Sequence, residues 1–123
     1  MKIIHIRNES RPGAGLLRAR FCDSFLCRLR GLTFRRSLGK DEALLLVERR
    51  ESRLDASIHM LAVFIDLAVV WLDNNKEVVD TRLARRWRPA YFPRRAARYV
   101  LEFSASRLAD FQIGDRLSFD QEL

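Results

Sequence analysis

Cysteine is scarce in this chain, with Cys22 and Cys27 as its two copies among 123 residues. Their spacing matches neither a redox Cys-x-x-Cys motif nor one half of a zinc site with its required second pair. If both lie on one helix, the two side chains point about 140° apart, because each residue turns the helix by about 100°. We therefore expect two free thiols, buried or half-buried, and a reducing compartment.

Long apolar runs are also missing. The longest, residues 58–72, is interrupted by His59 and Asp66 and falls short of the roughly 20 residues that a membrane helix needs. The opening segment MKIIHI has one lysine but no apolar stretch of signal-peptide length. We expect a cytoplasmic protein without a membrane span.

Histidine and lysine are rare, with two histidines and three lysines against twenty arginines. Two histidines without paired-ligand spacing give no support for a metal site, and no motif predicts a cofactor. The net charge of +7 and the pI near 10.4 favour an anionic partner such as nucleic acid. A coding bias toward arginine would produce the same excess, and most of the basic residues are dispersed.

Apolar residues make up 48% of the chain and charged residues 32%, which is the balance of a globular protein with one core. No repeat, low-complexity tract or linker divides it, so we expect a single domain over residues 1–123.

Apolar and polar residues alternate along much of the chain, which is typical of half-buried strands. The alternation covers residues 17–21, 54–60 and 117–119, and RYVLEF at residues 98–103 is a further strand. Residues 43–47 and 67–72 are apolar on both faces and suit central strands. Asn74 and Asn75 predict a tight hairpin turn, and Gly13 and Gly15 bracket the turn between the first two strands.

Helix signals are few. Asp23 or Ser24 can cap a short helix that ends at Gly31, with Phe25, Leu26, Leu29 and Leu32 as its apolar positions. Residues 104–111 predict a second short helix with Leu108 and Phe111 facing inward. Eight short strands and two short helices indicate a mainly β fold, either an antiparallel β-sandwich or a partly open barrel.

Four sequence blocks resemble the domain of unknown function 192 family over about residues 16–119. They are RGLTFRRSL from Arg30, the apolar run 43–47, VVWLDNNKEVVD from Val69, and YVLEF with IGDRLSF near the end. The resemblance implies a small β domain of uncharacterised activity. It also implies that the first block is largely scaffold.

One block departs from the family pattern. HMLAVFIDLA from His59 stands where the family typically has Trp-Met-Lys-Asn-Thr-x-x-Pro-Leu-Asp. Ala62, Val63 and Ala68 replace the asparagine, threonine and aspartate. Asp66 lies two residues before Ala68, on the same face of a strand. If relatives hold a ligand with that polar cluster, this member has lost most of it.

Five residues are candidate binding residues: His59, Asp66, Glu102, Asp115 and Arg30. A catalytic arrangement of Ser57, His59 and Asp66 is disfavoured, because strand neighbours two apart stand side by side. Glu102 fits either a structural salt bridge to an arginine or a site role. Asp115, after a glycine, most simply serves a turn. We assign no catalytic residue.

A basic cluster lies in residues 81–99, where prolines keep the centre out of regular structure. Its candidate polyanion-binding residues are Arg85, Arg86, Trp87, Arg88, Arg94, Arg95 and Arg98. Arginines interleaved with aromatics suit single-stranded nucleic acid, whereas a solvated loop that covers one end of the β structure is the simpler explanation.

Three classes of function remain open. The preferred one is a non-catalytic binding or accessory domain that uses an end of the β structure. The alternatives are a polyanion binder that acts through Arg82–Arg98, and an enzyme built on a convergence of His59, Asp66, Glu102 and Asp115.

Overall fold

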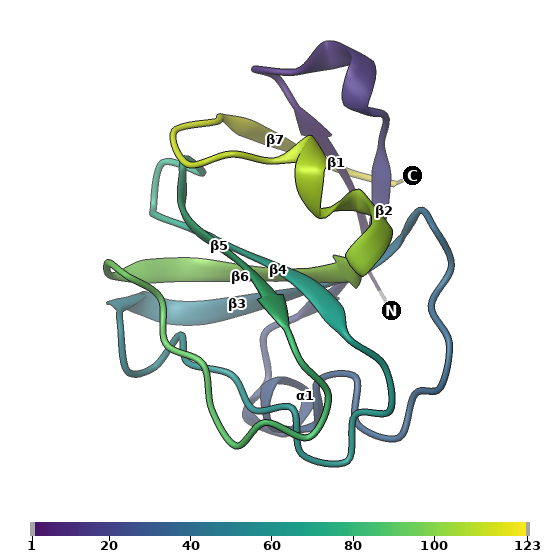
Figure 1. Ribbon diagram of the computed structural model, residues 1–123. Helices are drawn as coiled ribbons and strands as arrows, with labels where there is room; N and C mark the ends of the chain where they lie inside the picture. Colours follow the sequence, from purple (N-terminus) through teal and green to yellow (C-terminus); the bar gives the residue numbers. More distant parts are fainter. Residues whose placement is uncertain (1, 123) are drawn as a thin grey trace.

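The computed structural model describes residues 2–122 and consists of one curled, mixed β-sheet with a short helix and two loops packed on its outer face (Figure 1). The elements in chain order are β1 (Ile3–Asn8), η1 (Pro12–Ala14), β2 (Leu17–Cys22), α1 (Phe25–Arg30), β3 (Glu42–Ser52), β4 (Leu67–Leu72), β5 (Val78–Ala84), β6 (Ala97–Ser104), η2 (Ala105–Asp110) and β7 (Leu117–Gln121).

The sheet order is β5-β4-β6-β3-β2-β1-β7, and one neighbouring pair, β2 with β3, is parallel. Residues 23–41, which include α1, carry the chain from the end of β2 back to the level of its start, as parallel pairing requires. Within the described residues the edge strands β5 and β7 do not pair along their lengths; an isolated bridge between Glu77 and Arg116 joins only the residues just before them. The prediction of a mainly β fold is confirmed. The antiparallel β-sandwich is wrong, because the strands form one mixed, open sheet, and this sheet does not close into a barrel.

The central strands are buried on both faces, as their unbroken apolar sequences predict. Every residue of β4 is buried, as are residues 43–46 of β3. One core cluster, with Leu45, Val70 and Phe103, fills the inside of the curl. The other, with Leu46 and Trp71, lies on the outer face under α1 and the loops. This second core fixes the position of the candidate site.

The segment 54–60 is not a strand. Ala56, Ile58 and Met60 are buried, but the backbone pairs through an isolated bridge between Ile58 and Tyr91. The indole of Trp71 donates a 2.8 Å hydrogen bond to the Ala56 carbonyl and fixes the segment on the sheet. Alternating burial here comes from an irregular loop packed on the sheet, so seven strands are found where eight were expected.

The two cysteines form a disulfide, so the prediction of free thiols is wrong. Cys22 ends β2 and Cys27 lies in α1, with their Cα atoms 5.6 Å apart. The prediction failed because the cysteines lie on two elements rather than on one helix. Its corollary, a reducing compartment, loses its basis. None of the helices in residues 2–122 is long and apolar enough to span a bilayer.

The helix α1 begins and ends where the sequence indicates. Ser24 accepts a 3.2 Å hydrogen bond from the Cys27 N–H at its start, and Gly31, at φ 51°, ends it. Its orientation is not the expected one, because Phe25, Leu26 and Leu29 face solvent while Cys27 packs toward the core. The hairpin between β4 and β5 forms at residues 74–75 as predicted, although the residue with positive φ is Lys76.

Candidate binding surface around the short helix

Asp115 lies in the turn before β7, and its carboxylate is used within that turn. It accepts hydrogen bonds from Asn8 Nδ2 at 2.8 Å, Arg11 Nε at 3.0 Å and the Gln112 N–H at 2.9 Å. Burial opposes ionisation, but these donors outweigh it and lower the pKa of the Asp115 carboxyl. The arrangement fits the turn role expected from the preceding glycine.

Asp66 precedes β4 and holds the arginine-rich loop in place. Its carboxylate accepts the Arg86 N–H at 2.9 Å and Arg86 Nε at 3.2 Å, and Arg85 lies at 3.4 Å. The Arg86 N–H and guanidinium lower the pKa of Asp66 despite partial desolvation. Asp66 is thus engaged by arginines, and the family's aspartate position, Ala68, is fully buried.

Glu102 stands on β6 in the outer core, 4% exposed. It pairs with Leu44 of β3, and its Oε1 lies 3.7 Å from the place that a Cβ on Gly31 would occupy. Burial raises the pKa of Glu102 to about 7, and no ion pair within residues 2–122 opposes it. The salt bridge considered from the sequence is therefore not found.

His59 contacts the end of α1. Its Nε2 lies 2.8 Å from the Leu29 carbonyl oxygen, and its buried Nδ1 has no partner among the described residues. Ser57 donates instead to the Leu54 carbonyl at 2.7 Å. A serine–histidine hydrogen bond is absent from this part of the structure.

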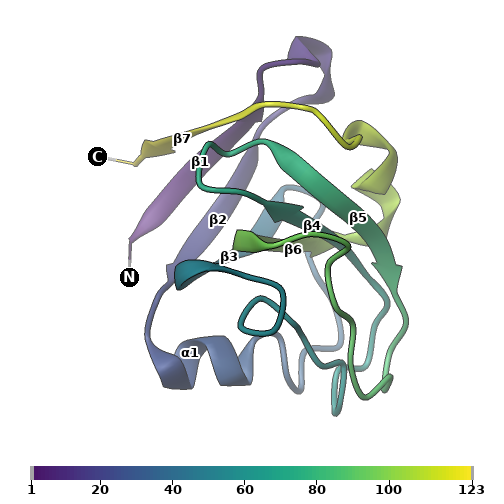
Figure 2. The same ribbon diagram turned by 90° about the vertical axis from the view of Figure 1, so that its left-hand side faces the viewer.

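Asp115, Asp66 and His59 therefore have three separate sets of partners, and the Glu102 side chain has no hydrogen-bond partner among residues 2–122. Asp115 is near the β1–β2 end, whereas His59 lies beside α1 at the opposite end of the molecule (Figures 1 and 2). The enzyme hypothesis required convergence of these residues, so it has no geometric basis. Residues 2–122 contain no group of three His, Cys, Asp or Glu residues placed to hold a metal ion.

The arginine-rich loop between β5 and β6 lies at the same end as α1. Trp87 donates its N–H to the Met60 carbonyl at 2.8 Å, and Met60 donates to the Arg88 carbonyl at 2.9 Å. These bonds join the arginine-rich loop to the loop between β3 and β4, which contains Met60. The exposed side chains of the cluster are Arg85, Arg86, Trp87, Arg88, Arg94 and Arg95, whereas Arg98 is half-buried and donates to the Glu48 carbonyl.

The helix α1 exposes three large apolar side chains. Phe25 is 68% exposed, Leu26 74% and Leu29 54%. The helix is nevertheless anchored by the Ser24 cap, the disulfide and the contact with His59. The three exposed side chains are therefore on a helix that is held to the rest of the molecule.

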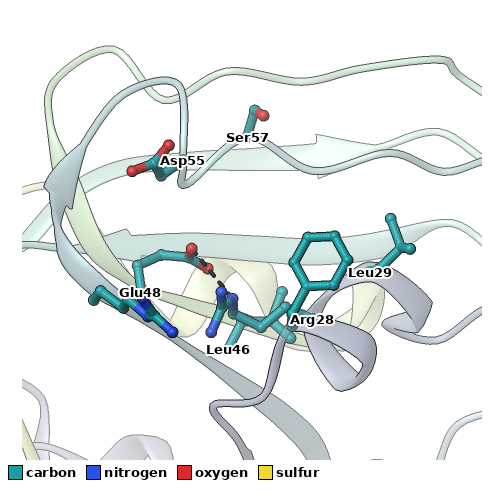
Figure 3. A pocket seen from close by; sticks show the side chains of 8 residues that line it. Arg28, Leu29, Leu46, Glu48, Asp55 and Ser57 are labelled. Carbon is teal, nitrogen blue, oxygen red and sulfur yellow. Dashed lines mark ion pairs between the residues drawn. The ribbon is translucent and has the colours of Figure 1, made fainter.

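A hollow of about 620 Å³, which we name the Glu48 hollow, lies on one side of α1. Arg28 and Glu48 point toward each other at 3.3 Å, and Asp55 and Ser57 lie across from them on the next loop (Figure 3). Burial raises the pKa of Glu48, the Arg28 guanidinium offsets part of this, and Asp55 adds to it. Leu46 of β3 also lines the hollow.

A second hollow, of about 370 Å³, lies on the other side and is named the Arg20 hollow. Arg20 of β2 and Leu44 of β3 are register partners in its wall. Leu26, Arg30 and Gly31 contribute from α1 and its end. Of the five predicted binding residues, Arg30 is the one that lines either of these two hollows.

Sequence reasoning missed Arg20, Arg28 and Glu48 as site residues. One signal was present for Glu48: it continues the buried positions Leu44 and Leu46 at a spacing of two. A charged residue on the apolar face of a strand needs a partner. The alternation in residues 17–21 puts Arg20 on the polar, solvent-facing side of its strand. In the structure α1 lies against this side at Arg20.

Comparison with known proteins places the chain among uncharacterised families. The profile of DUF192, described as Uncharacterized ACR, COG1430, matches residues 6–119. A UPF0127 protein of Thermococcus gammatolerans is 39% identical over 94% of this chain and 74% of its own length. One from Thermococcus kodakarensis is 35% identical over 93% and 72%. The crystal structure of a protein of unknown function from Novosphingobium aromaticivorans, 19% identical, has a TM-score of 0.79 over 94% of this chain and 83% of that one, and shows the shared fold.

Proposed function

Since the chain belongs to the DUF192 family, whose description assigns no activity, we propose from its surface that it is a non-catalytic binding domain. It docks an acidic partner protein through the end of the molecule that carries α1. The observation that carries this proposal is the exposure of Phe25, Leu26 and Leu29 on an anchored helix.

These side chains belong to a larger apolar surface. Phe34 and Trp87 lie beside the loop whose His59 contacts α1: the Phe34 N–H donates to the Ala62 carbonyl at 2.7 Å, and the Trp87 N–H donates to the Met60 carbonyl. We name this surface the apolar end; its members are Phe25, Leu26, Leu29, Phe34, Leu61 and Trp87, each at least 48% exposed. Clustered exposed apolar side chains of this kind mark interaction sites, whereas isolated ones need no explanation.

The charge around the apolar end selects the partner. Arg30, Arg36 and Arg88 are exposed there and have no carboxylate partner among residues 2–122. Aromatic residues and arginine are the residue types enriched in the energetic centres of protein interfaces. A second copy of the chain would bring like charges together, so an acidic surface fits better.

The test compares three proteins as bait in extracts of the source cells. They are the wild type, the variant with Phe25→Ser, Leu26→Ser and Leu29→Ser together, and the control Ile113→Ser, which removes an apolar side chain 46% exposed in the turn before β7. Circular dichroism and Tm check that each folds. We expect an acidic protein that the wild type and control retain and the triple variant loses. Equal capture by all three refutes the proposal.

A second candidate function is single-stranded nucleic-acid binding, which the free guanidinium groups of the loop favour. Arg88, Arg94 and Arg95 are exposed and form no ion pair within the described residues, and Trp87 can stack on a base. Against it, Arg85 and Arg86 are already paired with Asp66.

A salt titration with a labelled single strand tests this alternative. Changing Arg85, Arg86, Arg94 and Arg95 to alanine should flatten the dependence of log K on log salt concentration. The charge-matched control changes Arg7, Arg49, Arg50 and Arg116. An equal loss in both variants would mean non-specific attraction to a cationic protein, and no binding at low salt would eliminate the alternative.

A further inference from the structure

The Arg20 hollow has two chemically different walls. Leu44 is buried at its base, and Leu26 and the Cys22–Cys27 disulfide form an apolar side. Arg20, Arg30 and Arg35 line the rest. Its volume of about 370 Å³ lies within the range of small-molecule sites.

The guanidinium groups of this hollow are incompletely neutralised. Arg35 binds Glu42 at 2.8 Å, and Glu42 is also close enough to Arg20 for that charge to help lower its pKa. Arg30 has no ion pair in residues 2–122. The Nε of Arg20 is buried and has no hydrogen-bond partner there. This donor is closed to water, so a ligand would engage the other nitrogens of the same guanidinium, which are not buried.

Glu102 does not provide the missing charge. It shares its register row with Leu44 and Arg20 across β6, β3 and β2, but Leu44 separates it from Arg20. Its carboxyl is buried behind Gly31 and, with its pKa raised to about 7, is largely neutral below that pH. Three arginines therefore face one partly exposed carboxylate, Glu42.

From this geometry we infer that the Arg20 hollow binds a small organic anion, whose carboxylate or phosphate group contacts Arg20 and Arg30 and whose short apolar chain lies against Leu26 and Leu44. The guanidinium fork pairs with both head groups in a bidentate manner. The terminal nitrogens of Arg20, which form no hydrogen bond within residues 2–122, supply one contact, and the exposed Arg30 supplies the second. The hollow shares Leu26 and Arg30 with the docking surface but has Arg20 and Leu44 of its own, so anion binding and partner docking are measured separately.

The experiment follows backbone amide shifts by NMR in the wild-type protein titrated with octanoate, octyl phosphate, inorganic phosphate and octyltrimethylammonium. We expect saturable shifts at Arg20, Gly31 and Leu44 with the two octyl anions, weaker binding of inorganic phosphate, and none of the cation. The tighter of the two octyl anions identifies the head group.

Three variants assign the binding to this hollow. Arg20→Gln and Arg30→Gln should each weaken octyl-anion binding about tenfold, as expected for loss of one charge-assisted hydrogen bond. Arg30 is exposed, so its variant tests the inference even if Arg20→Gln unfolds. Arg49→Gln is the matched control, because Arg49 lines the Glu48 hollow on the other side of α1.

Three results overturn the inference. They are no saturable binding of either octyl anion, equal binding of the octyl cation, and equal weakening by Arg49→Gln. Equal binding of the cation would show that the tail adsorbs to the exposed face of α1, and equal weakening by Arg49→Gln would show non-specific attraction to a cationic protein. Either outcome removes the anion site and leaves the docking proposal standing. If no partner is captured but the anion still binds, the docking proposal fails and the anion site remains.

Discussion

The substitution Glu102→Gln should stabilise the protein at neutral and alkaline pH and have little effect in acid. Glu102 is 4% exposed on β6, and burial raises its pKa from 4.5 to about 7. A carboxyl with a raised folded-state pKa binds its proton more tightly in the folded state than in the unfolded one. The folded state is therefore favoured most below pH 4.5, and stability falls as the pH rises through 7.

The magnitude follows from the size of the shift. A difference of about 2.5 pKa units corresponds to about 3 kcal/mol, at about 1.4 kcal/mol per unit. Glutamine keeps the size and polarity of the side chain but does not ionise. The difference in unfolding free energy between variant and wild type should thus grow by about 3 kcal/mol between pH 4 and pH 8.

Urea denaturation at a series of pH values measures this difference. All other groups titrate in both proteins, so the subtraction isolates residue 102 if the slope m stays equal. Glu77→Gln, at a partly exposed glutamate, is the control for replacing a glutamate elsewhere in the chain. A difference for Glu102→Gln that does not change with pH would refute the inference that this buried carboxyl loses its proton without a compensating partner.

Three other substitutions test the scaffold. Arg107→Met should cost about 3 kcal/mol of unfolding free energy in urea denaturation, because the buried guanidinium donates to the Ala14 carbonyl at 2.7 Å and to Asp110 at 2.9 Å; a loss below 1 kcal/mol would contradict this role. Cys27→Ser should cost about 2 kcal/mol by the loop-entropy relation for so short a loop, and the unfolded, unreduced wild type should show no titratable thiol. Ala62→Asn should raise the unfolding free energy by about 0.5 kcal/mol, because Ala62 has φ 58° and asparagine tolerates that conformation better; a lower Tm would argue against strain there.

The strands could be predicted where an apolar run or an alternation of apolar and polar residues coincides with a regular extended backbone. The range 67–72 was predicted to the residue, and β2 and β6 nearly so. The segment 54–60 shows why period alone is insufficient, because an irregular loop with Trp71 bonded to Ala56 gives the same alternation of burial as a strand. The parallel pairing of β2 and β3 could not be deduced either, since it depends on the path that residues 23–41 take between the two strands.

The site was harder to predict because exposure is a tertiary property. The sequence identified Phe25, Leu26 and Leu29 as one apolar stripe, and the usual inference buries such a stripe. In the structure the disulfide fixes Cys27 toward the core and turns the stripe outward. The disulfide itself was not expected, so neither was the orientation.

The departure from the family pattern now has a physical meaning. Ala62 stands where the family typically has asparagine, and its φ of 58° is a conformation that asparagine adopts readily. Val63 and Ala68, at the other two positions, are buried in the two cores. These replacements fit structural roles, so the loss of that polar cluster does not require the loss of a ligand.

The Arg30–Val47 segment contributes to the Arg20 hollow as well as to the scaffold. Arg30, Gly31 and Arg35 line the Arg20 hollow, and Leu44 forms its base. Gly31, at φ 51°, ends α1 and also lines the hollow, and a Cβ there would lie in ordinary contact with the buried Glu102 carboxyl, 3.7 Å away. Gly31 therefore cannot separate a scaffold role from a site role. Arg30 can separate the two roles, because its exposed side chain has no ion pair in residues 2–122. If Arg30→Gln leaves Tm unchanged and weakens anion binding, the first arginine of this motif is a ligand contact.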